Sequence, residues 1–203
     1  MNTARQTVPD LQIHIRPALA GMLLAVLTLL FGFALGIVFG ANEDAIKSRL
    51  KASAMEVRTS VYHDDDIALK AALAKSWVYV QRAHLHAGGL GTAAVGLILV
   101  AMVLGGSATL TRAVSLGLGA GGLGYSAYWL LAAFRLPALG NSTAAKESLA
   151  WLAMPSSGAF VAATLALAVM LLLAMWRKPP GTSLKPVTTP PVPDAAMRPQ
   201  EVG

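Results

Sequence analysis

The chain has no cysteine and little charge. Its 203 residues include only 13% Asp, Glu, Lys and Arg, whereas soluble domains carry about 25%. Without cysteine, disulfides, thiolate metal sites and a cysteine nucleophile are excluded. The shortage of charge, together with 55% hydrophobic residues and a mean hydropathy of +0.59, excludes an ordinary water-soluble globule and a disordered chain. These features indicate a membrane protein.

Four apolar stretches are long enough to cross a bilayer, whose core of about 30 Å needs roughly 20 helical residues. None of them contains a charged side chain, and they cover residues 17–41, 87–106, 113–134 and 158–176. Arg112, Arg135 and Arg177 stand at boundaries, where long cationic side chains reach the headgroups. We predict an all-α polytopic membrane protein, a four-transmembrane-helix bundle over residues 17–176, with an N-terminal tail (1–16) and a proline-rich, disordered tail (177–203).

The first span, residues 17–41, differs from a cleaved secretory signal. A signal has an apolar core of about 7–15 residues and small residues before its cleavage site. This run is longer, and Phe39 stands two positions before Ala41, where a small residue is required. We therefore predict an uncleaved anchor.

The number of basic residues on each side of the membrane does not decide the orientation of the chain. Four spans place both termini on one side of the membrane, and Lys and Arg normally accumulate on the cytoplasmic side. The segments on the side of the termini hold fewer basic residues than the opposite segments, but Arg177 and Lys178 directly follow the last span. Because of that pair, we favour cytoplasmic termini.

The segment between the first two spans, residues 42–86, predicts an amphipathic helical loop. Ile46 and Leu50 fall at helical spacing, and Lys47 and Lys51 lie on another side of the same helix. Such a helix lies on the membrane surface or covers the end of the bundle.

The polar run of residues 63–66 ends that helix, and one of its aspartates is expected to cap the next. The next helix carries an apolar stripe and is expected to run into the second span; the stripe consists of Leu69, Leu73, Trp77, Val80 and His84. Residues 143–153 predict a short interfacial helix with Leu149 and Trp151 toward lipid.

Small residues recur along the spans at intervals of four, which places them in one row on a helix and lets two backbones approach closely. We expect a set of glycines to mediate helix packing, namely Gly32, Gly36, Gly40, Gly88, Gly96, Gly117 and Gly121. The row on the first span, which includes Gly32, Gly36 and Gly40, has two interpretations. We favour packing against another helix of the same bundle, and the alternative is association of two copies of the chain.

His84 and His86 are the most suggestive candidates for a metal or haem site, because imidazole suits copper, zinc, iron and haem. Two residues apart on a helix, however, they point about 200° away from each other. His84 then shares the face of Trp77 toward the bundle, and His86 shares the face of Arg82 toward headgroups or solvent. We favour two interfacial histidines without a metal, with a ligand role of His84 as the alternative.

His63, beside three aspartates, could bind a divalent cation weakly, but the run lacks the spacing of an EF-hand loop. A helix cap is the favoured interpretation. No Asp, Glu, Lys, Arg or His lies inside any of the four spans, although such residues usually mark ion and proton pathways. Hydroxyl groups within the spans either line a polar path or bond to their own backbones; they belong to Thr92, Ser115, Ser126 and Thr164.

The segment RAHLHAGGLG, residues 82–91, carries the pattern H-x-H-x-x-x-L-G at the start of a membrane helix. With residues 124–129 and 144–153, it resembles a group of small uncharacterised bacterial membrane proteins, and the resemblance covers residues 80–155. The segment is locally similar to the catalytic subunits of haem-copper oxidases, whose intramembrane histidines are absent here, so oxidase catalysis does not carry over. The resemblance implies a bacterial inner-membrane protein with a connection to a metal, haem or quinone.

Three functions remain. We favour a non-catalytic accessory or assembly subunit of a larger membrane complex, with the bilayer and other membrane subunits or further copies of the chain as partners, and no nucleic acid. The alternative is a metal- or haem-binding protein that uses His84, His86 and His63 at the outer membrane face, with copper or haem as its cofactor. The third is a small-solute transporter.

Overall fold

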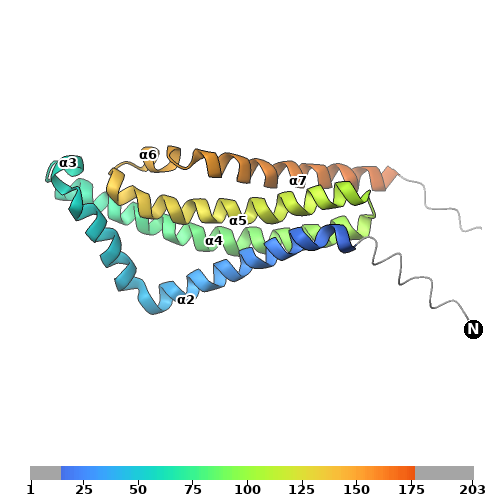
Figure 1. The fold of residues 1–203 in the computed structure, drawn as a ribbon, viewed down its shortest axis with the longest axis horizontal. Helices are drawn as coiled ribbons and strands as arrows, with labels where there is room; N and C mark the ends of the chain where they lie inside the picture. Colours follow the sequence, from blue (N-terminus) through green and yellow to red (C-terminus); the bar gives the residue numbers. More distant parts are fainter. Residues whose placement is uncertain (1–14, 177–203) are drawn as a thin grey trace, which may run out of the picture.

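The structure, a computed structural model, describes residues 15–176 and shows an elongated bundle of helices (Figure 1). The elements are η1 (Arg16–Ala18), α2 (Leu19–Glu56), α3 (Arg58–Tyr62), α4 (Asp66–Leu104), α5 (Ala108–Leu139), α6 (Ser142–Glu147) and α7 (Ala150–Trp176). No strand occurs between residues 15 and 176, so the all-α class is confirmed. The predicted tails lie almost wholly outside the described residues.

Three of the described helices are long and apolar enough to cross a membrane. They extend over Arg16–Glu56, Asp66–Leu104 and Ala150–Trp176. These helices are compatible with a multi-pass membrane protein. The predicted span at residues 113–134 lies in α5, which is not one of the three, so the fourth span is not confirmed.

α5 lies between the other long helices (Figure 1) and packs against α2, α4 and α7. Its glycines make this arrangement possible. A Cβ on Gly117 would stand 2.9 Å from the Cβ of Ala163 on α7, and one on Gly121 would stand 2.7 Å from the backbone oxygen of Ser156. On the opposite side, a Cβ on Gly119 would collide with the backbone of Gly21 on α2. The low side-chain volume of α5 therefore lets three helices approach one backbone.

α2 bends at Asn42, whose backbone dihedrals (φ −137°, ψ 29°) are not helical. The helix starts beside α4 and α5 and diverges from them up to the bend, and after the bend it runs back toward α3 (Figure 1). The predicted loop thus begins as a continuation of the first long helix. Leu50 and Ala54 are buried in this part of α2, whereas Lys47 and Lys51 are exposed.

The turn between α3 and α4 reverses the chain through two left-handed residues, His63 (φ 51°) and Asp64 (φ 61°). Asp65 then caps α4, accepting hydrogen bonds from the amides of Ile67 (2.8 Å) and Ala68 (3.1 Å). The predicted aspartate cap is confirmed. So is the continuity of the second helix, because α4 runs unbroken from Asp66 to Leu104.

The region of the predicted interfacial helix contains α6 and the first turn of α7. Asn141 caps α6, with its side-chain oxygen 2.7 Å from the amide of Thr143. Trp151 is exposed as expected, but the prediction that Leu149 faces lipid is wrong: its side chain is 1% exposed and packs into the core. The chain turns between the two helices there, which directs Leu149 inward.

Candidate functional site

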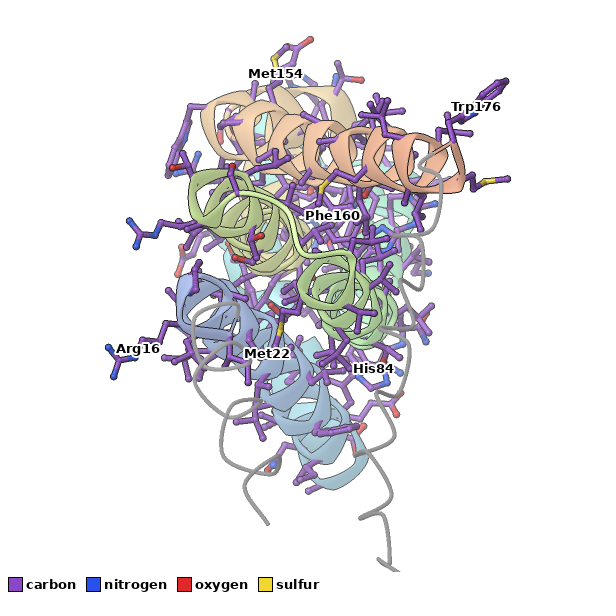
Figure 2. The ribbon with its side chains drawn as sticks, turned by 90° about the vertical axis from the view of Figure 1, so that its right-hand side faces the viewer. Arg16, Met22, His84, Met154, Phe160 and Trp176 are labelled. Atoms are coloured by element: carbon purple, nitrogen blue, oxygen red, sulfur yellow. The ribbon has the colours of Figure 1, made fainter. Side chains whose placement is uncertain are left out.

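His84 lies between α4 and α2 (Figure 2). Its Nδ1 atom is 2.8 Å from the backbone oxygen of Gly32. A Cβ on Gly36 would stand 3.0 Å from the ring carbon Cε1, so a side chain at that position would displace the imidazole. The edge of the ring meets Phe39, with 5.9 Å between centroids and 72° between planes. The prediction that His84 faces the bundle is confirmed.

His86 points to the other side of α4, against α5. Its ring stacks on Tyr125, with centroids 5.2 Å apart, and lies 5.8 Å from the ring of Trp129. The guanidinium carbon of Arg82 is 4.9 Å from the Trp129 centroid, a cation–π contact. The predicted side of the helix is therefore right, but aromatic rings of α5 contact His86 where headgroups or solvent were expected.

This aromatic cluster was missed from the sequence. A signal for it exists: Tyr125, Tyr128 and Trp129 stand three and four positions apart, a spacing that gathers side chains on one face of a helix. In the structure, Tyr128 and Trp129 meet edge to face, 5.1 Å between centroids. The indole nitrogen of Trp129 is buried and has no hydrogen-bond partner among residues 15–176.

His63 lies apart from both. It is three positions before α4 begins, so roughly 27 Å of helix separate its turn from His84. The aspartates beside it already have partners: Asp65 is the cap, and Arg58 pairs with Asp64 (3.4 Å) and Asp66 (3.0 Å).

The structure does not bring the three predicted metal ligands together. His84 contacts α2, His86 contacts α5 and His63 is in the distant turn. Within the described range, no group of three or more His, Asp or Glu side chains is arranged to hold a metal ion.

A cleft lies between α4 and the part of α2 around its bend. Its two adjoining parts each have a volume of about 570 Å³ and share Trp77 as a wall. One part reaches His84 and is lined also by Phe39, Glu43 and Leu85. We call this part the bend cleft. Its lining residues come from two segments about forty positions apart in the sequence. The bend at Asn42 contains no proline, so the sequence gives no signal for it.

The predicted packing glycines divide into two groups. Gly32, Gly36, Gly117 and Gly121 stand where a Cβ would meet a neighbouring helix within about 3.1 Å, and a Cβ on Gly40, Gly88 or Gly96 would meet nothing within 4 Å. The second group therefore does not mediate close packing through a missing side chain within residues 15–176. Gly40 and Gly96 point out of the bundle because the inward faces of their helices are occupied by other residues.

The row on α2 is used inside the bundle. Thr28 is fully buried, and a Cβ on Gly32 would lie 3.0 Å from the backbone nitrogen of Gly88 on α4. This contact supports the favoured interpretation that the first-span row packs within one chain.

The hydroxyl groups within the helices are bonded to backbone. Each of the four hydroxyl groups that were candidates for a polar path donates to a carbonyl oxygen three or four positions earlier in its own helix, at 2.7–3.0 Å. These residues are Thr92, Ser115, Ser126 and Thr164. Of the two alternatives, bonding to the helix backbone is therefore the one observed. These donors are not directed into a polar path.

Comparisons with protein-family models, with curated proteins and with solved structures find no match to this chain.

Proposed function

We propose that the chain is a non-catalytic, four-span protein of a bacterial inner membrane that acts as an accessory or assembly subunit of a larger membrane complex. The observation that carries this proposal is a row of small residues on the outer face of α4, formed by Gly88, Gly89, Thr92 and Gly96. We call it the outer glycine row. A Cβ on any of its three glycines would meet nothing within 4 Å.

An outward row of this kind suits a helix of another protein. In lipid there is no hydrophobic drive between helices, and small residues favour association because they let backbones approach. Beyond the end of the row, the same face of α4 carries the exposed apolar side chain of Leu99. Here α4 offers close approach to a partner outside the chain.

The interior supports a role without catalysis or transport. The buried hydroxyl groups of Thr28, Ser115 and Ser126 donate to carbonyl oxygens of their own helices, and glycine contacts close the space around α5. Ser76 follows the same rule, donating to the backbone oxygen of Ala72. The surfaces left for function are thus on the outside of the bundle and in the bend cleft.

The four-span topology is supported by the position of α5. Because α2, α4 and α7 surround it, it meets less lipid than they do and needs less hydropathy to lie at the same depth. The beginning of η1 and the end of α7 lie at the same end of the bundle (Figure 1), which is consistent with an even number of crossings. Cytoplasmic termini remain the favoured orientation.

Crosslinking in native membranes tests this proposal. Because the chain has no cysteine of its own, a single introduced cysteine is the only thiol that can react. A single Thr92→Cys variant, which leaves the glycines of the row in place, is treated with a short thiol-reactive photocrosslinker, because amines are rare within a bilayer; it is expected to join a second membrane protein. The matched control is Leu165→Cys on α7, a position that is also exposed (62%) but carries no such row.

Equal crosslinking at the two positions, or a lone chain after mild solubilisation, would contradict the accessory role. A product containing only two copies of the chain would also contradict it, because the row would then serve self-association.

A further inference from the structure

The bend cleft has a polar group at its inner end and an aromatic wall. Phe39 and Trp77 stand 5.8 Å apart between centroids, and His84 lies on the far side of Phe39. Figure 2 shows His84 beside the lower part of α2. The cleft lies at the level where the apolar run of α2 ends and its charged residues begin, since the bend at Asn42 directly precedes Glu43. A ligand there has its head near the headgroup region and its tail in lipid.

The hydrogen bond to Gly32 determines what His84 offers to that ligand. A carbonyl oxygen only accepts, so Nδ1 of His84 carries the proton that it shares with the Gly32 oxygen, 2.8 Å away. In the neutral imidazole, Nε2 is then a hydrogen-bond acceptor. Nε2 has no partner among the described residues. The site therefore favours a ligand that donates a hydrogen bond to Nε2 of His84.

The charges around the cleft favour an uncharged head. Glu43 is the acidic group of the lining, and it forms an ion pair with Lys47. Lys47 in turn lies 5.0 Å from the ring centroid of Trp77. Since Glu43, the charged residue that lines the bend cleft, is paired with Lys47 of the adjoining part, a charged head gains no unpaired partner in the bend cleft. Gln81 adds a neutral amide.

From these features we propose that the bend cleft binds a neutral lipid alcohol, such as a diacylglycerol. Its hydroxyl donates to Nε2 of His84, and its chains lie against Phe39, Trp77 and Leu85, which continues the cleft toward lipid with an exposed side chain. Gly36 is a positioning residue in this site, because a larger side chain would push the imidazole away. This site is separate from the outer glycine row, so it does not depend on the accessory role.

Nitrogen NMR of the histidine rings tests the proposal on the full-length protein in phosphatidylcholine nanodiscs, whose headgroup has no hydroxyl. The chain has four histidines, and a His84→Gln variant assigns the resonances of His84. Without ligand, we expect a protonated Nδ1 and a bare Nε2. Addition of dioctanoylglycerol should shift the Nε2 resonance in a saturable way, while the resonances of His86 stay in place.

The O-methyl ether of the same diacylglycerol is the matched probe, since it keeps the chains and loses the donor. We expect its half-saturation to be about tenfold higher, the effect of losing one hydrogen bond. A Phe39→Ala variant, which leaves the imidazole intact, should bind the alcohol several-fold more weakly. Phosphatidylglycerol, which carries hydroxyls on a charged head, should not compete with the alcohol.

Three outcomes would overturn the proposal: a protonated Nε2 in the free protein, an equal response to the alcohol and to its ether, or no saturable shift at all. Competition by phosphatidylglycerol would overturn the neutrality of the site.

Discussion

The rows Thr28–Gly32–Gly36 on α2 and Gly88–Thr92–Gly96 on α4 have the same spacing and opposite surroundings. The first is covered by α4, and its glycines stand against Gly88 and His84. The second is open, apart from the approach of Gly32 to the Gly88 backbone. Spacing therefore establishes that small residues share a face, and only packing decides whether that face lies inside the molecule or is left for a partner.

The largest difference is expected between leucine substitutions in the two rows. Gly32→Leu forces a side chain against the backbone of α4 and should destabilise the bundle by about 3 kcal/mol. Gly96→Leu points into open space and replaces a helical glycine, so it should not destabilise the protein and should stabilise it by up to about 1 kcal/mol. Denaturant titration in mixed micelles measures both. If the two variants were equally stable, the distinction between the rows would be lost.

A finer comparison lies within the α2 row. Gly36→Ala places a methyl group 3.0 Å from Cε1 of His84 and should destabilise the protein by about 1–2 kcal/mol, because a tightly packed neighbour must shift. Gly40→Ala is the control, since its Cβ meets nothing within 4 Å. The same titration applies, and the Nδ1 resonance of His84 should move only in Gly36→Ala. If the Nδ1 resonance also moved in Gly40→Ala, Gly40 would belong to the set of glycines that pack against His84, which would contradict the structure.

Tyr62 provides a reference outside both rows. Its hydroxyl donates to the backbone oxygen of Pro137 (2.7 Å), so Tyr62→Phe should cost about 1 kcal/mol. Burial also raises the pKa of Tyr62 above its ordinary value. The contribution is therefore complete below the unfolded-state pKa, about 10, and is lost as pH rises through the higher folded-state pKa.

The pH dependence of unfolding in the wild type and in Tyr62→Phe checks the last point. The difference between them should shrink only in alkaline solution. A difference that shrinks between pH 5 and 8 would mean that another group titrates.

The smallest effect is expected for alanine in the outer glycine row. Gly96→Ala replaces a helical glycine with nothing nearby, so it should stabilise the isolated protein by roughly 0.5–1 kcal/mol. In native membranes the same methyl group should weaken the crosslink to the partner. Stabilisation without any loss of that crosslink would place the partner elsewhere.

Much of the fold follows from the sequence because apolar length and charge boundaries are local properties. The helical class, the aspartate cap at Asp65 and the inward face of His84 are of this kind. The direction of Leu149 is not, because it depends on a turn between two short helices.

The candidate site was less predictable because it depends on contacts between segments that are distant in the sequence. Its wall joins Phe39 to Trp77 across two helices, and its opening depends on the bend at Asn42. The geometry that separates His84 from His86, by contrast, followed from the helical period alone. Contacts between distant segments need the packing to be known, whereas relations within a helix do not.

The glycines of α5 also bear on how the protein enters the membrane. α5 is rich in glycine and is not among the three helices that are long and apolar enough to cross a membrane, yet it follows α4 after only Gly105, Gly106 and Ser107. In the four-span topology proposed above, the two helices insert as one hairpin, and the hydropathy of α4 carries α5 into the membrane with it. A lesion that weakens α4 during synthesis would then remove two crossings at once, and because two is an even number, α7 would keep its orientation.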